Sequence, residues 1–325
     1  MALKHLVSNF ARRASTLLVV VSVIAASLVG LSLRASRADA TLSEYFPAIT
    51  VAGGNGASSN ANQLANPYGV AVDTSGNIYV ADTDNQRIQM WAPGATEGTT
   101  VAGGNELGSN ANQLAFPNGV AVDTSGNIYI ADAYNSRIQK WVPGATEGTT
   151  VAGGNDFGSN ANQLAFPNGV AVDTSGNIYI ADTFNNRIQK WAPGATEGTT
   201  VAGGNGVGSL ANQLAYPYGV AVDTTGNIYI ADRANHRIQK WTPGATEGTT
   251  VAGTNGYGSN ANQLAYPSGL AVDTTGNIYI TDTENSRIQE IVRRITTVAG
   301  GNGQGANANQ LAYAHGVAVD TSGNI

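Results

Sequence analysis

The chemical pair that recurs most regularly in this chain is an aspartate followed five positions later by an arginine. The pair occurs five times, each time with an asparagine between its members. Across a tight turn, the carboxylate and the guanidinium can form a charge-assisted hydrogen bond, and the asparagine tolerates a left-handed backbone. Five identical copies favour a structural role over catalysis, so we interpret the pairs as clamps that hold a turn. They are Asp82 with Arg87, Asp132 with Arg137, Asp182 with Arg187, Asp232 with Arg237, and Asp282 with Arg287.

Few residues of the chain could support catalysis or metal binding. After residue 40 the only histidines are His236 and His315, and the chain has no cysteine. Disulfides, thiolate nucleophiles and zinc–thiolate sites are therefore excluded, and no histidine recurs near a serine that it could activate. We predict no catalytic residue, no metal site and no cofactor. Calcium is the alternative at the turn that begins at Asp73, although this turn lacks the alternating carboxylates and final glutamate of a calcium loop.

The first 40 residues have the layout of a secretory signal peptide. Lys4, Arg12 and Arg13 precede an apolar run over 16–33, and the small residues Ala38 and Ala40 flank Asp39. This pattern predicts cleavage after Ala40, a short linker over 41–48, and a protein that is secreted, periplasmic or at the cell surface. The alternative is an uncleaved anchor, because the apolar run is just long enough to span a bilayer. Only in that case do we expect a membrane association.

Charge argues against one class of partner. Removing residues 1–40 takes away five of the 16 Lys and Arg and one of the 22 Asp and Glu, which leaves a net charge of −10. A phosphate backbone repels a chain this acidic that has no basic cluster. We therefore do not expect nucleic acid as a partner.

The clamps lie inside a repeat of 50 residues. Units begin near residues 51, 101, 151, 201 and 251, and a sixth begins near 298 and stops partway. Within one unit, short apolar or alternating runs at 69–73, 77–82, 87–91 and 99–102 are separated by glycine, proline and asparagine turns. Four strands in a repeat of this length are typical of a β-propeller blade.

Three segments of the unit resemble the NHL repeat. They are Pro67-Tyr68-Gly69-Val70-Ala71-Val72-Asp73, Gly76-Asn77-Ile78-Tyr79-Val80-Ala81-Asp82 and Asn85-Gln86-Arg87-Ile88-Gln89. The resemblance recurs five times in full and once in part over 49–325. It implies a propeller, commonly six-bladed, that serves mostly as a binding platform and occasionally as an enzyme.

Counting strands then predicts an all-β, six-bladed propeller of four-stranded antiparallel blades. The sixth first strand is expected to begin at residue 316, and the sequence stops at Asn324-Ile325, inside the sixth second strand. We therefore expect the last blade to be incomplete and the sequence to be a C-terminally truncated fragment. Residues 49–51 supply a spare fourth strand that could close the ring, so that fewer strand edges are exposed.

The repeats differ from one another mainly in two places, before the first strand and between the second and third strands. In an antiparallel blade both places lie on the same side, whereas the unchanging turns lie on the opposite side. We call the first side the variable face and take it as the candidate binding surface; neutral drift of exposed loops is the alternative explanation. Its candidate ligand-binding residues are Tyr68, Asp84, Phe116, Tyr134, Phe166, Phe184, Tyr216, Tyr218, Arg233, His236, Tyr266, Glu284 and His315.

Aromatic loops with interspersed acidic residues suit a protein, peptide or glycan ligand. The leading hypothesis is therefore a secreted or surface-located, non-enzymatic scaffold, expected to be a monomer. The alternative is a metal-dependent lyase or hydrolase whose site lies in the central channel. The three-histidine metal site of some propeller lyases of related sequence cannot be assembled from the two histidines that follow residue 40.

Overall fold

A computed structural model describes residues 50–291, 295–300, 304–305, 310–320 and 325 of the chain. All of them belong to one compact unit, Pro47–Ile325. The expected signal peptide at 1–40, the linker at 41–48 and Ile49 lie outside the described residues. Within the ranges that are described, no helix is long and apolar enough to cross a bilayer.

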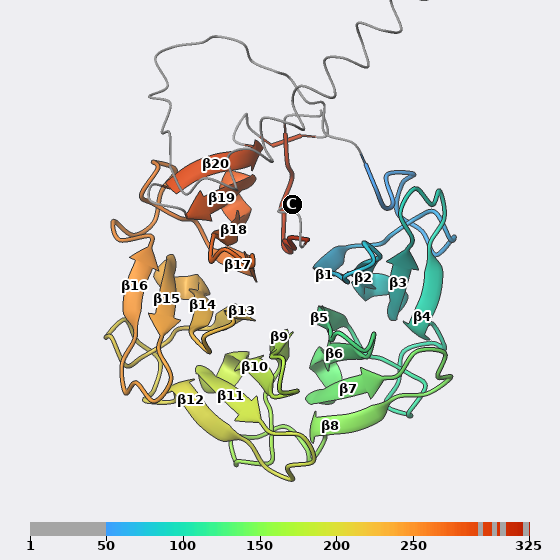
Figure 1. The fold of residues 1–325 in the computed structure, drawn as a ribbon, viewed down its shortest axis with the longest axis horizontal. Helices are drawn as coiled ribbons and strands as arrows, with labels where there is room; N and C mark the ends of the chain where they lie inside the picture. The colour runs from blue at the N-terminus through green and yellow to red at the C-terminus, as the bar shows by residue number, and fades with distance from the viewer. Residues whose placement is uncertain (1–49, 292–294, 301–303, 306–309, 321–324) are drawn as a thin grey trace, which may run out of the picture. The chain divides into compact units, whose positions relative to one another are not determined.

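The described chain forms five antiparallel sheets of four strands each, and the strands of each sheet follow the order of the sequence. Figure 1 shows these sheets arranged around a common axis, with the first strand of each nearest the axis and the fourth at the outside. We call the sheets blades 1 to 5. The expectation of four strands per repeat is correct for these five units.

The strand bounds follow the repeat closely. Blade 1 consists of β1 (Pro67–Val72), β2 (Ile78–Asp82), β3 (Arg87–Trp91) and β4 (Thr99–Gly103). Blade 2 consists of β5 (Pro117–Val122), β6 (Ile128–Asp132), β7 (Arg137–Trp141) and β8 (Thr149–Gly153). Blade 3 consists of β9 (Pro167–Val172), β10 (Ile178–Asp182), β11 (Arg187–Trp191) and β12 (Thr199–Gly203). Blade 4 consists of β13 (Pro217–Val222), β14 (Ile228–Asp232), β15 (Arg237–Trp241) and β16 (Thr249–Ala252). Blade 5 consists of β17 (Pro267–Val272), β18 (Ile278–Asp282), β19 (Arg287–Ile291) and β20 (Ile295–Gly300).

The second and third strands of every blade are joined by one short 3-10 turn. These turns are η1 (Thr83–Asn85), η2 (Ala133–Asn135), η3 (Thr183–Asn185), η4 (Arg233–Asn235) and η5 (Thr283–Asn285). The residue after each turn has a left-handed backbone, with φ between 49° and 54°. Each turn therefore reverses the chain within a few residues and presents its tip on the variable face.

The expectation of six blades with an incomplete last one is wrong, because the structure has five complete four-stranded blades. Residues 316–319, expected as the first strand of a sixth blade, form no strand, and neither do Thr50 and Val51, expected as its fourth. A strand requires a ladder of backbone hydrogen bonds to a neighbour, and among the described residues no strand pairs with either segment.

Residues 315–316 nevertheless lie between β17 and β1 at the inner ring (Figure 1). A Cβ atom added to Gly316 would overlap the carbonyl oxygen of Tyr68, and one added to Gly269 would lie 2.7 Å from that of His315. At two other inner boundaries, a Cβ atom added to Gly69 or Gly119 would likewise overlap the backbone of the first strand of the next blade. Glycine is thus required here because neighbouring backbones approach to contact distance.

The hydrophobic core lies between blades rather than within one. At the first boundary, Tyr79 and Ile88 of blade 1 pack with Leu114, Ile130 and Trp141 of blade 2. The same positions pack together at the next two boundaries. Each blade therefore covers an apolar face of its neighbour, which explains why the first and second strands are nearly continuous apolar runs.

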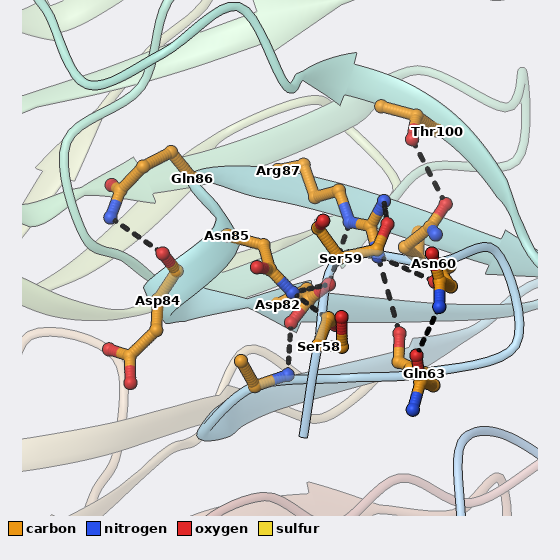
Figure 2. A network of polar contacts seen from close by, with 12 residues as sticks. Ser58, Ser59, Asn60, Gln63, Asp82, Asp84, Asn85, Gln86, Arg87 and Thr100 are labelled. Atoms are coloured by element: carbon orange, nitrogen blue, oxygen red, sulfur yellow. Dashed lines mark hydrogen bonds and ion pairs between the residues drawn. The ribbon is translucent and has the colours of Figure 1, made fainter. Parts of the chain in front are cut away.

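The Asp82–Arg87 pair forms a buried ion pair at the end of β2. Arg87 Nε donates to Asp82 Oδ2 over 2.7 Å, and Asn85 Nδ2 donates to the same oxygen over 2.9 Å. Asp82 Oδ1 accepts a hydrogen bond from the backbone N–H of Ala65. The remaining nitrogens of Arg87 donate to the carbonyls of Ser59, Asn60 and Gln63 (Figure 2).

This network ties the turn between the second and third strands to the loop that precedes the first strand. All five pairs have Nε–Oδ2 distances of 2.6–2.7 Å, and all five aspartate side chains are fully buried. Their geometry fits a clamp, since each arginine donates to three backbone carbonyls of the loop while it pairs with the aspartate.

On the opposite side, each turn after the first strand is organised by its own aspartate. Asp223 accepts hydrogen bonds from the backbone N–H groups of Thr225 and Asn227 and from both of their side chains. Burial alone would raise the pKa of Asp223, but these hydrogen bonds outweigh it and lower the pKa from 3.8 to about 2. The pKa values of Asp73, Asp123, Asp173 and Asp273 are lowered in the same way.

We predict that Arg187→Ala lowers the free energy of unfolding by about 3–5 kcal/mol, because it leaves the Asp182 carboxylate buried without its cation. Urea denaturation monitored by tryptophan fluorescence measures the change. The control is Lys190→Met, which removes a cation from the same strand and introduces the residue that blade 1 carries at Met90. A cost for Arg187→Ala no larger than that of the control would refute the clamp.

We also predict an acid-sensitive contribution from the Asp223 turn. Because folding lowers the pKa of this carboxyl, its contribution is present above pH 3.8 and is lost as the pH falls through about 2. Asp223→Asn should therefore lower the thermal midpoint at pH 7, and the difference from wild type should disappear near pH 2. Exposed Glu197, changed to Gln, is the control for loss of one charge. A difference that is independent of pH would contradict the prediction.

Candidate binding site on the variable face

The tips of the turns and the loops that precede the first strands meet on the variable face. In blade 2 the backbone N–H of Tyr134 donates to the carbonyl of Ala115, and the same bond joins Phe184 to Ala165 in blade 3. Because the clamp fixes both segments, the side chains at the turn tip and just before the strand are held close together. These are the positions at which the repeats vary.

Aromatic rings form a continuous arc across blades 2, 3 and 4. Ring centroids are 4.5 Å apart for Phe116 and Tyr134, and 4.8 Å apart for Tyr134 and Phe166. Phe166 then stacks on Phe184 at 4.7 Å, and Phe184 meets Tyr216 edge-to-face at 6.2 Å. These separations lie in the range of favourable aromatic pairs. The side chains of Tyr134 and Phe184 remain 59% and 50% exposed, so much of the arc faces solvent.

A second group of rings lies over blades 4 and 5. The guanidinium of Arg233 lies between two tyrosine rings, 5.1 Å from the centroid of Tyr218 and 5.2 Å from that of Tyr266. His236 contacts Tyr266 at 4.5 Å and Tyr257 at 5.0 Å. The Tyr257 hydroxyl donates to Glu284 over 3.4 Å, which links this group to the turn tip of blade 5.

A hollow of about 370 Å³ opens between the arc and the axis. Of the candidate residues, those that line it are Tyr68, Asp84, Phe116, Tyr134, Phe166, Phe184, Tyr216, Tyr218 and Arg233. His315 stacks on Tyr68 at 4.1 Å and lines the axial channel beneath. His236, Tyr266 and Glu284 are outside the lining of the hollow. The structure therefore brings nine of the thirteen candidates into one concave surface.

The residue before the proline of each first strand has an unusual backbone. Phe116, Phe166, Tyr216 and Tyr266 have φ between 48° and 50°, and Asn66 has the same conformation. The left-handed region is disfavoured for bulky residues, and the α-like regions are disfavoured before proline. Strain of this kind, on the order of 1 kcal/mol or more at each position, is often found at functional sites.

Three of these strained positions are supported by the preceding blade. Gln86 Oε1 accepts the backbone N–H of Phe116 at 2.6 Å, and Asn186 Oδ1 accepts that of Tyr216 at 2.9 Å. His236 Nδ1 accepts that of Tyr266 at 3.2 Å, which requires a neutral imidazole. Sequence reasoning missed Gln86 and Asn186 as positioning residues. The sequence shows a polar side chain at each of these varying positions. It does not show that the side chain accepts a hydrogen bond from a backbone N–H 30 residues later.

Burial controls the ionisable groups around the hollow. It raises the pKa of Tyr218 to about 12, with a further contribution from Tyr68, so the hydroxyl of Tyr218 stays protonated. It lowers the pKa of His236, and together with Arg233 it lowers the pKa of His315. Both imidazoles are therefore neutral at neutral pH. Among the described residues no three His, Cys, Asp or Glu side chains come together as metal ligands.

The model of the NHL repeat matches residues 64–91, 114–141, 164–191, 214–241 and 264–291. Each match begins in the loop before a first strand and ends at the last residue of a third strand. A search of curated protein sequences found no match.

Solved structures with the same architecture share little sequence with this chain. A structural genomics protein of unknown function from Bacteroides thetaiotaomicron aligns with a TM-score of 0.62 and 18% identity, over 84% of this chain and 70% of its own. A nidogen/laminin complex aligns with a TM-score of 0.57 and 19% identity, over 78% and 84%. A streptogramin B lyase aligns with a TM-score of 0.50 and 14% identity, over 83% and 91%.

At such identities the likeness to these structures shows the fold alone. The repeat matches are more specific, because all five coincide in register with the five blades. On this evidence the chain belongs to the NHL-repeat β-propeller proteins.

Proposed function

We propose that this chain is an exported, non-enzymatic scaffold that binds a protein or peptide segment through the variable face. The observation that carries the proposal is the continuous arc of rings beside a hollow of about 370 Å³. Exposed apolar side chains gathered on one side of a protein mark interaction surfaces. The opposite side consists of repeated Asp-Thr-Ser/Thr-Gly-Asn turns and Pro-Gly-Ala-Thr-Glu-Gly loops, which contain no aromatic residue.

Composition favours a protein or peptide over a glycan. Aromatic residues and arginine are enriched, and lysine is depleted, at the centre of protein interfaces. The hollow shows this composition, since it is lined by aromatic rings, Asn and Thr side chains, one arginine and one carboxylate. Its volume suits a few side chains of an extended segment rather than a whole folded domain. The nidogen/laminin structure is a propeller-containing neighbour that was solved as a protein complex, which agrees with this reading.

Export is part of the proposal and rests on the N-terminal sequence. The basic residues, the apolar run and Ala38-Asp39-Ala40 are the parts of a cleavable signal. We therefore place the partner in the periplasm, at the cell surface or outside the cell.

The double variant Tyr134→Ala/Phe184→Ala should bind the captured partner at least about tenfold more weakly, because removing an aromatic side chain from an interface centre costs on the order of 2 kcal/mol. The fold should tolerate both changes, since blade 4 carries alanine at the equivalent position, Ala234. Capture from native extracellular material identifies the partner, and surface plasmon resonance measures the affinity.

The matched control is Val142→Ala, which removes an exposed apolar side chain on the opposite side. Blades 1 and 3 carry alanine there, at Ala92 and Ala192. Equal binding by wild type and the double variant would rule out the variable face as the interface. If the captured material proved to be carbohydrate, the assignment to a protein or peptide would be wrong.

A further inference from the structure

Arg233 breaks the fivefold pattern at the mouth of the axial channel. The equivalent residues are Thr83, Ala133, Thr183 and Thr283. In blades 1 and 3 the threonine hydroxyl donates to the carbonyl of the first-strand proline in the next blade, over 2.7 Å in both cases. Blade 4 has an arginine at this position, so it lacks the threonine hydroxyl that makes this bond between blades. Threonine or alanine is therefore sufficient for the fold at this position, and an arginine is not required there.

Among the described residues, no carboxylate pairs with the charge of Arg233. The five clamp arginines each pair with an aspartate, whereas Arg233 forms no ion pair with any described residue. Its Nε atom is buried and has no hydrogen-bond acceptor. A buried N–H donor without an acceptor is costly, and the tyrosine rings on the two sides of the guanidinium offset that cost only in part.

The surroundings of Arg233 suit an anionic group with one charge. Tyr68, Tyr218, Asn118 and Asn168, which carry hydroxyl or amide groups, line both the hollow and the axial channel. One carboxylate, Asp84, lines the hollow but forms no ion pair with Arg233. Phosphorylated segments are usually bound by clusters of arginines. A single guanidinium in an acidic protein instead matches a carboxylate, which its planar fork can bind with two hydrogen bonds.

We propose that Arg233 binds a carboxylate of the peptide segment, while an adjacent apolar side chain of that segment packs on the rings of Phe184 and Tyr134 across the hollow. This inference rests on the proposed function and specifies the ligand for that site. The carboxylate is either the C-terminus of the segment or the side chain of Asp or Glu.

The test uses four synthetic probes titrated into the folded protein and followed by NMR chemical shifts. Acetyl-Phe-Phe with a free C-terminus is compared with its C-terminal amide, and acetyl-Phe-Glu-amide is compared with acetyl-Phe-Gln-amide. We expect at least one acid to bind about tenfold or more tightly than its neutral counterpart, since hydrogen bonds between charged groups are worth more than neutral ones. The pair that shows the preference identifies the source of the carboxylate.

The decisive variant is Arg233→Thr, which introduces the residue of blades 1, 3 and 5 and is expected to keep the thermal midpoint. It should remove the preference for the acid without abolishing binding of the neutral probe. The control, Lys190→Met, removes one positive charge far from the hollow and should leave the preference intact.

Several results would overturn the assignment. They are equal binding of acid and amide in both pairs, no measurable binding of either acid at millimolar concentration, or a preference that survives in Arg233→Thr. Loss of the preference in the Lys190→Met control would also overturn it, by showing a general charge effect. Binding of glucuronate that depends on Arg233, without binding of the peptide acids, would reject the peptide. If the neutral probes bind and depend on Tyr134 and Phe184 while Arg233→Thr has no effect, the proposed function stands and the carboxylate site fails.

Discussion

The rest of this structure depends on one buried ion pair that is repeated in every blade. Asp82 and its equivalents bring together Arg87, Asn85 and the backbone of Ala65, and Arg87 in turn holds three carbonyls of a loop with no regular structure of its own. Burying such a pair is favourable only when hydrogen bonds satisfy the rest of both groups. Because each pair is satisfied, a long and largely polar loop can be fixed on the sheet although it places only a few apolar residues, such as Leu114, in the core.

The contacts that stabilise the fold are therefore separate from the proposed binding surface. The apolar contacts lie between blades, and the turns opposite the variable face are closed by their own aspartates. Side chains at the turn tips therefore take part in neither, and substitutions there need not disturb the core between blades or the clamps. Tyr134, Phe184, Ala234 and Glu284 occupy one structural position in four blades whose backbones are nearly the same. A framework of this kind can change its binding surface at little cost in stability.

The sequence was sufficient to predict the four strands of each blade, because the apolar runs, the turn residues and the Asp–Arg spacing are all local signals that are repeated five times. It also placed the varying positions on one side, since this follows from the antiparallel order alone. It failed on the number of blades. Residues 316–319 have the same sequence as the corresponding residues of blades 1 to 4. A strand nevertheless forms only when another segment pairs with it, and the sequence of one segment does not show whether that partner is present. The position of Arg233 between Tyr218 of its own blade and Tyr266 of the next was likewise out of reach, because it depends on how blades 4 and 5 pack together.

The strained positions before the first strands show why the candidate site needs neighbouring blades rather than one blade. An aromatic residue with φ near 50° before proline is unfavourable for an isolated chain. In blades 2, 4 and 5 the conformation is held by an acceptor from the preceding blade: Gln86, Asn186 or His236. The rings of Phe116, Tyr216 and Tyr266 are thus displayed only when two blades dock. The proposed binding surface is therefore a product of blade packing, because part of its backbone geometry is held by acceptors that the neighbouring blade supplies.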